Sequence, residues 1–135
     1  MKKSRIITAL TLSVLAATLF SFVDYNALQE WITLGSRKVN FGLDKDVIEV
    51  TYHEGTFTAI KLEVTDGALN MHRCVIHFEN GTQQEVELRY TFAKGSESRV
   101  IDLNGNRRFI KKIVFWYDSK DLQLKRATLT VFGRK

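Results

Sequence analysis

The sequence contains no proline, and it has only one cysteine among its 135 residues. Proline often marks the linkers between domains, so its absence leaves no visible domain boundary in the body of the chain. A single cysteine, Cys74, cannot form an internal disulfide, which excludes the class of small secreted domains built on disulfides. We expect Cys74 to be a buried thiol within a strand, and the alternative is a reactive or intermolecular thiol.

Motifs for metal binding are also missing. His53, His72 and His77 do not stand at the spacing of a zinc site with one another or with a cysteine, so neither a metal nor a cofactor is expected. If residues 69–78 form one regular strand, His72 shares a face with Cys74 and His77 lies on the opposite face. A β-bulge in this strand would change that arrangement.

Carboxylates provide only weak candidates for a site. Asp44 and Asp46 can offer oxygens to Ca²⁺, but the lysine between them and the lack of the remaining loop ligands argue against calcium. No serine stands in a nucleophile-elbow motif, so we predict no catalytic residue. Glu54, Glu79 and Glu85 can in principle pair as the acid and base of a small envelope hydrolase acting on glycans, which is the alternative to a non-enzymatic protein.

Charged residues are absent from Ile6 to Val23, directly after a basic start at Lys2, Lys3 and Arg5. A basic start followed by an apolar run is typical of a signal peptide. We therefore predict an apolar signal helix within residues 1–27 and export to the periplasm or the exterior. A helix of this length also approaches the thickness of the bilayer core, so a retained N-terminal membrane anchor is the alternative.

The body of the chain, residues 28–135, carries a modest charge. The leader holds three basic residues and one acidic residue, so the body is two charges less basic than the whole chain at +5. Neither this charge nor export favours nucleic acid as a partner. We expect contact with a membrane only through a retained leader. The body is long enough to form one domain with its own core.

Polar and apolar residues alternate in several short segments of this body, notably 59–64, 85–92 and 127–131. Such alternation is typical of antiparallel strands that bury one face. Asn80-Gly81 lies between two such segments and predicts a hairpin. The fold class expected is all-β, an antiparallel, jelly-roll-like β-sandwich of about eight or nine strands. The expected strands are residues 31–34, 38–41, 47–52, 58–65, 69–78, 84–92, 99–103, 109–117 and 127–132. The side chains expected to face the core from the sixth strand are Val86, Leu88, Tyr90 and Phe92.

Three motifs resemble those of a family of exported bacterial β-sandwich domains of unknown function. They are Leu34-Gly35-x-Arg37, Ile101-Asp102-Leu103-x-Gly105-x-x-Arg108 and Gly133-Arg134. This resemblance implies the fold and export, and it implies no activity. The second motif, followed by Ile110-Lys111-Lys112-Ile113, is also distantly similar to discoidin-type, galactose-binding-like jelly rolls, many of which bind sugars or membrane surfaces through loops at one end.

The second motif places a carboxylate among arginines. Asp102 ends a predicted strand close in sequence to Arg99, Arg107 and Arg108. It can shape a binding loop, or it can pair with an arginine or accept hydrogen bonds from the turn. The arginines can contribute to a basic face that binds an anionic surface, and a solvated sheet edge is the alternative. The other basic residues of such a face are Lys111, Lys112, Lys125 and Arg126.

Trp116 is the remaining candidate ligand-binding residue. In a regular strand Phe115 and Tyr117 face the core with Ile113, and Trp116 lies outside beside Val114. An exposed tryptophan on a flat strand can stack against a sugar, and the alternative is that Trp31 or the N-terminal segment covers it. The sequence thus predicts an exported, non-enzymatic binding or structural module of the cell envelope, with a glycan or an anionic surface as its partner.

Overall fold

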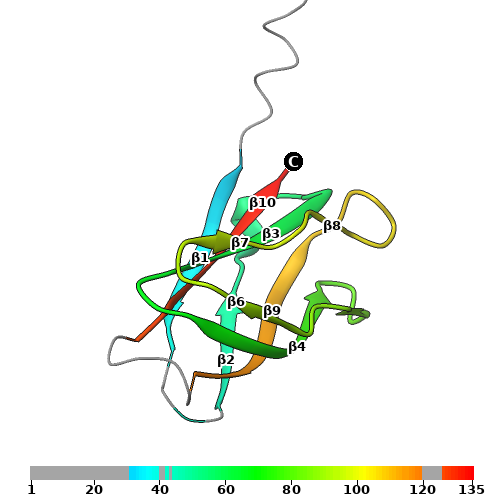
Figure 1. Ribbon diagram of the computed structural model, residues 1–135. Helices are drawn as coiled ribbons and strands as arrows, with labels where there is room; N and C mark the ends of the chain where they lie inside the picture. Colours follow the sequence, from blue (N-terminus) through cyan, green and yellow to red (C-terminus); the bar gives the residue numbers. More distant parts are fainter. Residues whose placement is uncertain (1–30, 40–41, 43, 120–125) are drawn as a thin grey trace, which may run out of the picture. The chain divides into compact units, whose positions relative to one another are not determined.

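Two antiparallel sheets form the fold in the computed structural model, which describes residues 31–39, 42, 44–119 and 126–135 (Figure 1). Sheet A contains, in order, β1 (Ile32–Lys38), β10 (Thr128–Arg134) and β3 (Ala59–Thr65), and β3 also pairs with two short strands, β7 (Ser96–Glu97) and β8 (Ile101–Asp102). Sheet B contains, in order, β2 (Asp44–Glu49), β9 (Ile110–Asp118) and β4 (Leu69–Phe78), and β4 also pairs with β5 (Gln83–Val86) and β6 (Tyr90–Phe92). A short 3₁₀ turn, η1 (Tyr52–Glu54), follows β2.

The all-β class and the antiparallel sandwich predicted from the sequence are confirmed, with ten strands among the described residues. The predicted signal helix lies outside these residues, as do Lys125 and the end of the strand expected at 38–41. Within the described part of the chain, no helix is long and apolar enough to cross a membrane.

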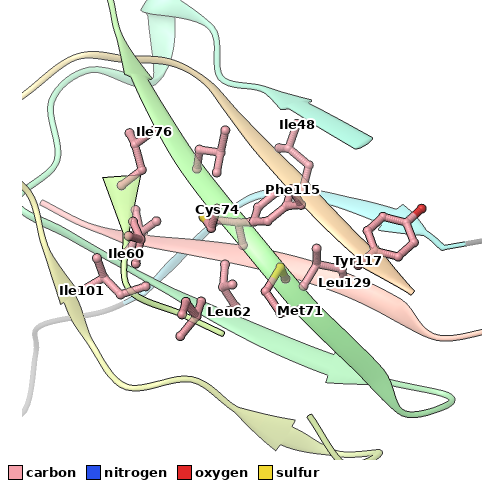
Figure 2. Close-up of a cluster of buried hydrophobic side chains, with 14 of the residues drawn as sticks. Ile48, Ile60, Leu62, Met71, Cys74, Ile76, Ile101, Phe115, Tyr117 and Leu129 are labelled. Atoms are coloured by element: carbon pink, nitrogen blue, oxygen red, sulfur yellow. The ribbon is translucent and has the colours of Figure 1, made fainter. Parts of the chain in front are cut away.

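Apolar side chains from the facing sides of both sheets form one core, part of which Figure 2 shows. Ile60 and Leu62 contribute from β3, and Phe115 and Tyr117 contribute from β9. Burying each side chain of this size stabilises the fold by about 1.5–3 kcal/mol. Cys74 lies in the same core, so its prediction as a buried thiol is confirmed, and burial raises the pKa of this thiol to about 12.

A β-bulge interrupts β4 and corrects the expectation for His72. Met71 pairs with Tyr117 while Arg73 pairs with Trp116, so His72 is an extra residue in the strand. The extra residue shifts the alternation, and His72 and Arg73 are both exposed while Met71 and Cys74 are both buried. His72 therefore does not share a face with Cys74.

The strand predicted at 84–92 is broken, because residues 87–89 separate β5 from β6. The break faces the bulge of β4: β5 pairs with residues 74–77 of that strand, and β6 pairs with residues 69–71. In the gap, the carbonyl of Glu87 accepts a hydrogen bond from the Arg99 guanidinium at 3.1 Å in place of a strand partner.

A single strand, β1, replaces the first two strands expected from the sequence. Gly35, which falls between the strands expected at 31–34 and 38–41, lies inside β1 against Ile48 of the other sheet. A Cβ atom at this position would lie 2.7 Å from Cγ2 of Ile48. The glycine therefore permits close approach of the two sheets rather than a turn.

Candidate functional site

The side chain of Arg108 bonds the turn of the β4–β5 hairpin. Its guanidinium donates to Oδ1 of Asn80 at 3.1 Å, to Oγ1 of Thr82 at 2.9 Å and to the carbonyl of Asn104 at 2.7 Å. It also lies 3.8 Å from the ring centroid of Phe78, within the range of a cation–π contact. All these contacts are structural, so Arg108 connects the hairpin to the turn that precedes β9.

Asp102 and Arg107 are both exposed, and no described residue bonds their charged groups. The main-chain carbonyl of Asp102 accepts a hydrogen bond from Nε2 of Gln84 at 2.9 Å, and Oε1 of Gln84 accepts one from the amide of Asn104 at 2.8 Å. Gln84 thus bridges sheet B to the β8 turn. The arginine partner considered for Asp102 is not found among the described residues.

The residues predicted to bind a ligand do not form one site. Arg99 lies beside the gap between β5 and β6, whereas Arg107 and Arg108 lie in the turn before β9. Trp116 lies on the outer face of sheet B, flanked in register by Lys45 of β2 and Arg73 of β4. The sequence pattern cannot predict this separation, because it depends on the pairing of distant strands.

Trp116 is on the outer face, as predicted, and both of its cross-strand neighbours are cations. Nζ of Lys45 lies 5.6 Å from the indole centroid, and Cζ of Arg73 lies 4.6 Å from it. Nε of Arg73 also donates to Oε1 of Glu85 at 2.7 Å. The indole is therefore half-buried between two cations, and it is not an open stacking platform.

Two valines on the outer side of sheet B are also buried. Val75 and Val114 pair with each other and are only 2% and 4% exposed. They lie apart from the main core, and Val47 of β2 completes their row. Trp116 lies one row away on the same face.

Trp31 does not cover Trp116. It lies with cations of sheet A, since Nζ of Lys61 is 4.8 Å and Cζ of Arg134 is 5.2 Å from its ring centroid. Lys61 belongs to β3 and points away from the core, as its place in the alternation predicts. That explanation for a covered Trp116 is therefore wrong.

The outer face of sheet B carries the cations Lys45, Arg73 and Lys112 together with two carboxylates, Glu85, which bonds Arg73, and Glu49, which pairs in register with Lys112. The cationic face, as we name it, consists of Lys45, Arg73, His77, Lys112 and Trp116. Burial lowers the pKa of His77, and the charges of Lys112, Lys111 and Lys45 lower it further. His77 is thus mainly neutral near neutral pH, while the lysines around it supply the positive potential.

A hollow of about 320 Å³ lies along the start of β4 and the neighbouring β6, next to the Arg73 end of the cationic face. We call it the Tyr90 hollow; its lining is Asn70, Met71, His72, Arg89, Tyr90 and Thr91. Tyr90 was expected to face the core, but it is 58% exposed because β6 is short and lies at the edge of the sheet. A neighbouring hollow of about 310 Å³ shares Arg89 and Tyr90 and extends toward Glu87, Glu97 and Arg99.

Hydrogen bonds link the polar residues beside the Tyr90 hollow. Oγ1 of Thr91 donates to Oδ1 of Asn70 at 2.8 Å, and Nδ2 of Asn70 donates to Oδ1 of Asp118 at 2.9 Å. The other carboxylate oxygen of Asp118 bonds Nε2 of His72. Asp118 is buried while His72 is exposed, so the carboxylate orients an imidazole that faces solvent.

The other carboxylates of the described residues form no recognisable centre. Asp46 accepts a hydrogen bond from the hydroxyl of Tyr117 at 2.6 Å, which satisfies that buried group. Among the described residues, no three His, Cys, Asp or Glu side chains cluster as a metal site. Arg73 lowers the pKa of Glu85, which favours a carboxylate over a general acid.

The strand pairing and the shared core define the described part of the chain as an antiparallel β-sandwich domain. Residues 6–133 match the model of the family described as "Domain of unknown function (DUF2541)", so the chain belongs to that family. Two solved structures of the tobacco streak virus coat protein are 17% and 18% identical to it, cover 78% of this chain and 85% and 86% of theirs, and have TM-scores of 0.29. None of the curated proteins matches the sequence.

Proposed function

We propose that this protein is an exported, non-enzymatic module of the cell envelope that binds an anionic glycan on the cationic face. One observation supports this function above the others: Lys45, Trp116 and Arg73 form a row across three adjacent strands. Lys112 extends the positive charge along the same face. A row of cations fits an extended polyanion better than it fits a single small ion.

The chemistry of the face favours a polymer whose charge and apolar surface alternate. The lysine ammonium groups supply charge, and the exposed part of the Trp116 indole supplies an apolar contact for a sugar ring. Arg73 is held by Glu85, so it is less available to a ligand than Lys45. Attraction between exposed charges is screened by salt, so affinity should fall as ionic strength rises.

Binding to heparin and to polygalacturonate, with neutral dextran as the uncharged comparison, tests this function. The double variant Lys45→Ser/Lys112→Ser should bind both anionic polymers about tenfold more weakly at low salt, because each surface cation contributes about 0.5–1 kcal/mol. The matched control is Lys94→Ser/Arg107→Ser, which removes two exposed cations elsewhere and leaves the same net charge. It should retain binding.

An equal loss of affinity in both double variants would refute a site on this face, because the loss would then follow from the lower net charge alone. Trp116→Phe supplies a second measurement, since the remaining Trp31 lies on the other sheet. Quenching of fluorescence by the polymers should disappear in Trp116→Phe. Quenching that persists would assign the contact to the face around Trp31.

Export belongs to the same proposal and is supported by the basic start and apolar run within residues 1–27. We include in the proposal that the strands of the sandwich are connected in a jelly-roll-like order. Fractionation of expressing bacteria, followed by N-terminal sequencing, tests export. A soluble periplasmic or secreted chain that begins near residue 28 is the expected result. A chain that keeps Met1 and sediments with membranes would instead indicate the retained anchor.

A small hydrolase acting on glycans is the alternative function. Hydrolysis of a glycosidic bond needs one carboxyl group with a raised pKa to act as the acid. Arg73 shifts the pKa of Glu85 in the opposite direction. Release of reducing ends from peptidoglycan or from either anionic polymer by the purified protein would overturn the non-enzymatic proposal.

A further inference from the structure

We propose that the Tyr90 hollow is a second binding site, which takes a small ring compound bearing a carboxylate or a phosphate, such as an anionic monosaccharide. This site adjoins the cationic face at His72 and Arg73 but shares no residue with it, and it does not depend on the function proposed for that face. Its volume of about 320 Å³ lies at the lower end of the range typical of small-molecule sites.

Arg89 provides the charge in this hollow. Its side chain is exposed and lines the hollow, and no described residue accepts a hydrogen bond from its guanidinium. A guanidinium offers several donors in a planar fork that matches the two oxygens of a carboxylate or phosphate. Arg73 and Arg108, in contrast, already bond acceptors within the protein.

His72 provides a second polar group in a fixed orientation. The bulge of β4 turns it outward, and Asp118 bonds its Nε2 atom. Asn70 bonds the same carboxylate and is in turn bonded by Thr91. This chain of hydrogen bonds, which joins residues of β4, β6 and β9, fixes the orientation of the imidazole beside the hollow.

Tyr90 provides the surface for a ring. It is 58% exposed, and Phe92 packs against it edge to face at 4.9 Å between ring centroids. The buried Phe92 supports the phenol ring from within the fold. An exposed, supported aromatic ring is suited to stacking on a sugar or another flat ring.

The charges around the hollow favour an anionic ligand. Asp118 is the carboxylate nearest His72 and is already bonded by His72 and Asn70. Glu87 and Glu97 line the neighbouring hollow and are not part of the lining of the Tyr90 hollow. The free donor that remains in the Tyr90 hollow is the guanidinium of Arg89, and it attracts an oxyanion.

Titration of the purified, ¹⁵N-labelled protein with glucuronic acid and with glucose 6-phosphate tests the proposal, with glucose as the neutral comparison. Saturable shifts of the amides of Asn70, His72 and Thr91 at millimolar ligand are the expected result. The two acids distinguish a carboxylate site from a phosphate site. Glucose should cause much smaller shifts.

The variant Arg89→Gln should weaken binding of the preferred acid by at least about tenfold, the loss expected for one charge-assisted contact. Its matched control, Arg107→Gln, removes an exposed arginine of the turn before β9 and should leave the affinity unchanged. His72→Gln should weaken binding without unfolding, because position 72 contributes nothing to the core.

Several results would overturn this site. These are equal affinity for glucose and the acids, equal losses in Arg89→Gln and Arg107→Gln, or no saturable shift with either acid. The spectra of the variants show directly whether the fold is retained. Failure here leaves the polymer result unaffected, because Lys45→Ser/Lys112→Ser changes a different part of sheet B.

Discussion

Replacing Arg108 by alanine separates a structural role from a role in ligand binding. The substitution removes three hydrogen bonds, to Asn80, Thr82 and Asn104, and the contact with the ring of Phe78. In a partly exposed setting each hydrogen bond contributes about 0.5–1 kcal/mol, and the cation–π contact contributes about 0.5–1 kcal/mol. The expected loss in the free energy of unfolding is therefore about 2–4 kcal/mol.

For a domain of this size that loss lowers Tm by roughly 10 °C. Thermal unfolding followed by circular dichroism measures it. The neighbouring Arg107→Ala is the matched control, because Arg107 is exposed and should change the stability by less than about 0.5 kcal/mol. Arg108→Lys keeps the charge but loses the fork, so its Tm should lie between those of the wild type and Arg108→Ala.

Equal Tm values for Arg108→Ala and Arg107→Ala would refute the structural role of Arg108. Polymer affinity provides the second readout at a temperature where both variants are folded. We expect both single variants to bind as the wild type does. A loss of affinity in folded Arg108→Ala alone would return Arg108 to the ligand-binding site expected from the sequence.

Three further predictions follow from buried or crowded groups. Gly133→Ala should destabilise the fold by about 1–3 kcal/mol in a denaturant titration, because the new methyl group would lie 2.7 Å from Cδ1 of Phe57; an unchanged midpoint would contradict this packing. Thiol reagents should label Cys74 only after unfolding, since burial raises its pKa to about 12, and fast labelling of the native protein would show an accessible thiol. The pKa of His77 should rise in Lys112→Ala, as followed by NMR titration, since a positive neighbour is removed. Because the fold lowers this pKa, His77 contributes stability above its ordinary pKa that is lost as the pH falls, and a pKa that does not move would exclude the contribution of Lys112.

Local pattern was enough to predict much of the fold. The alternation of residues 59–64 gives the two faces of β3, and the bounds of β4 agree with the prediction for 69–78. The hairpin at Asn80-Gly81 is confirmed, with Gly81 at a positive φ of 88°. These features depend on neighbours in sequence, which is why the sequence alone predicts them.

The candidate sites depend on strand pairing, which the sequence does not reveal. Lys45, Arg73 and Trp116 come from three strands and meet only through their register. Tyr90 has the sequence position of a core residue, but it lies at the edge of the sheet where nothing covers it completely. Arg99 and Arg108 are close in sequence to Asp102, yet their guanidinium groups bond Glu87 and Asn104 instead.

The bulge of β4 has a consequence for how this strand can change. Without residue 72, the inward positions from Leu69 through Met71, Cys74 and Ile76 would fall on a strict two-residue alternation. Deleting His72 would therefore keep the same side chains in the core and remove the imidazole bonded to Asp118. Residue 72 is therefore a position of β4 that core packing does not require, so the imidazole can be removed without changing which side chains face inward.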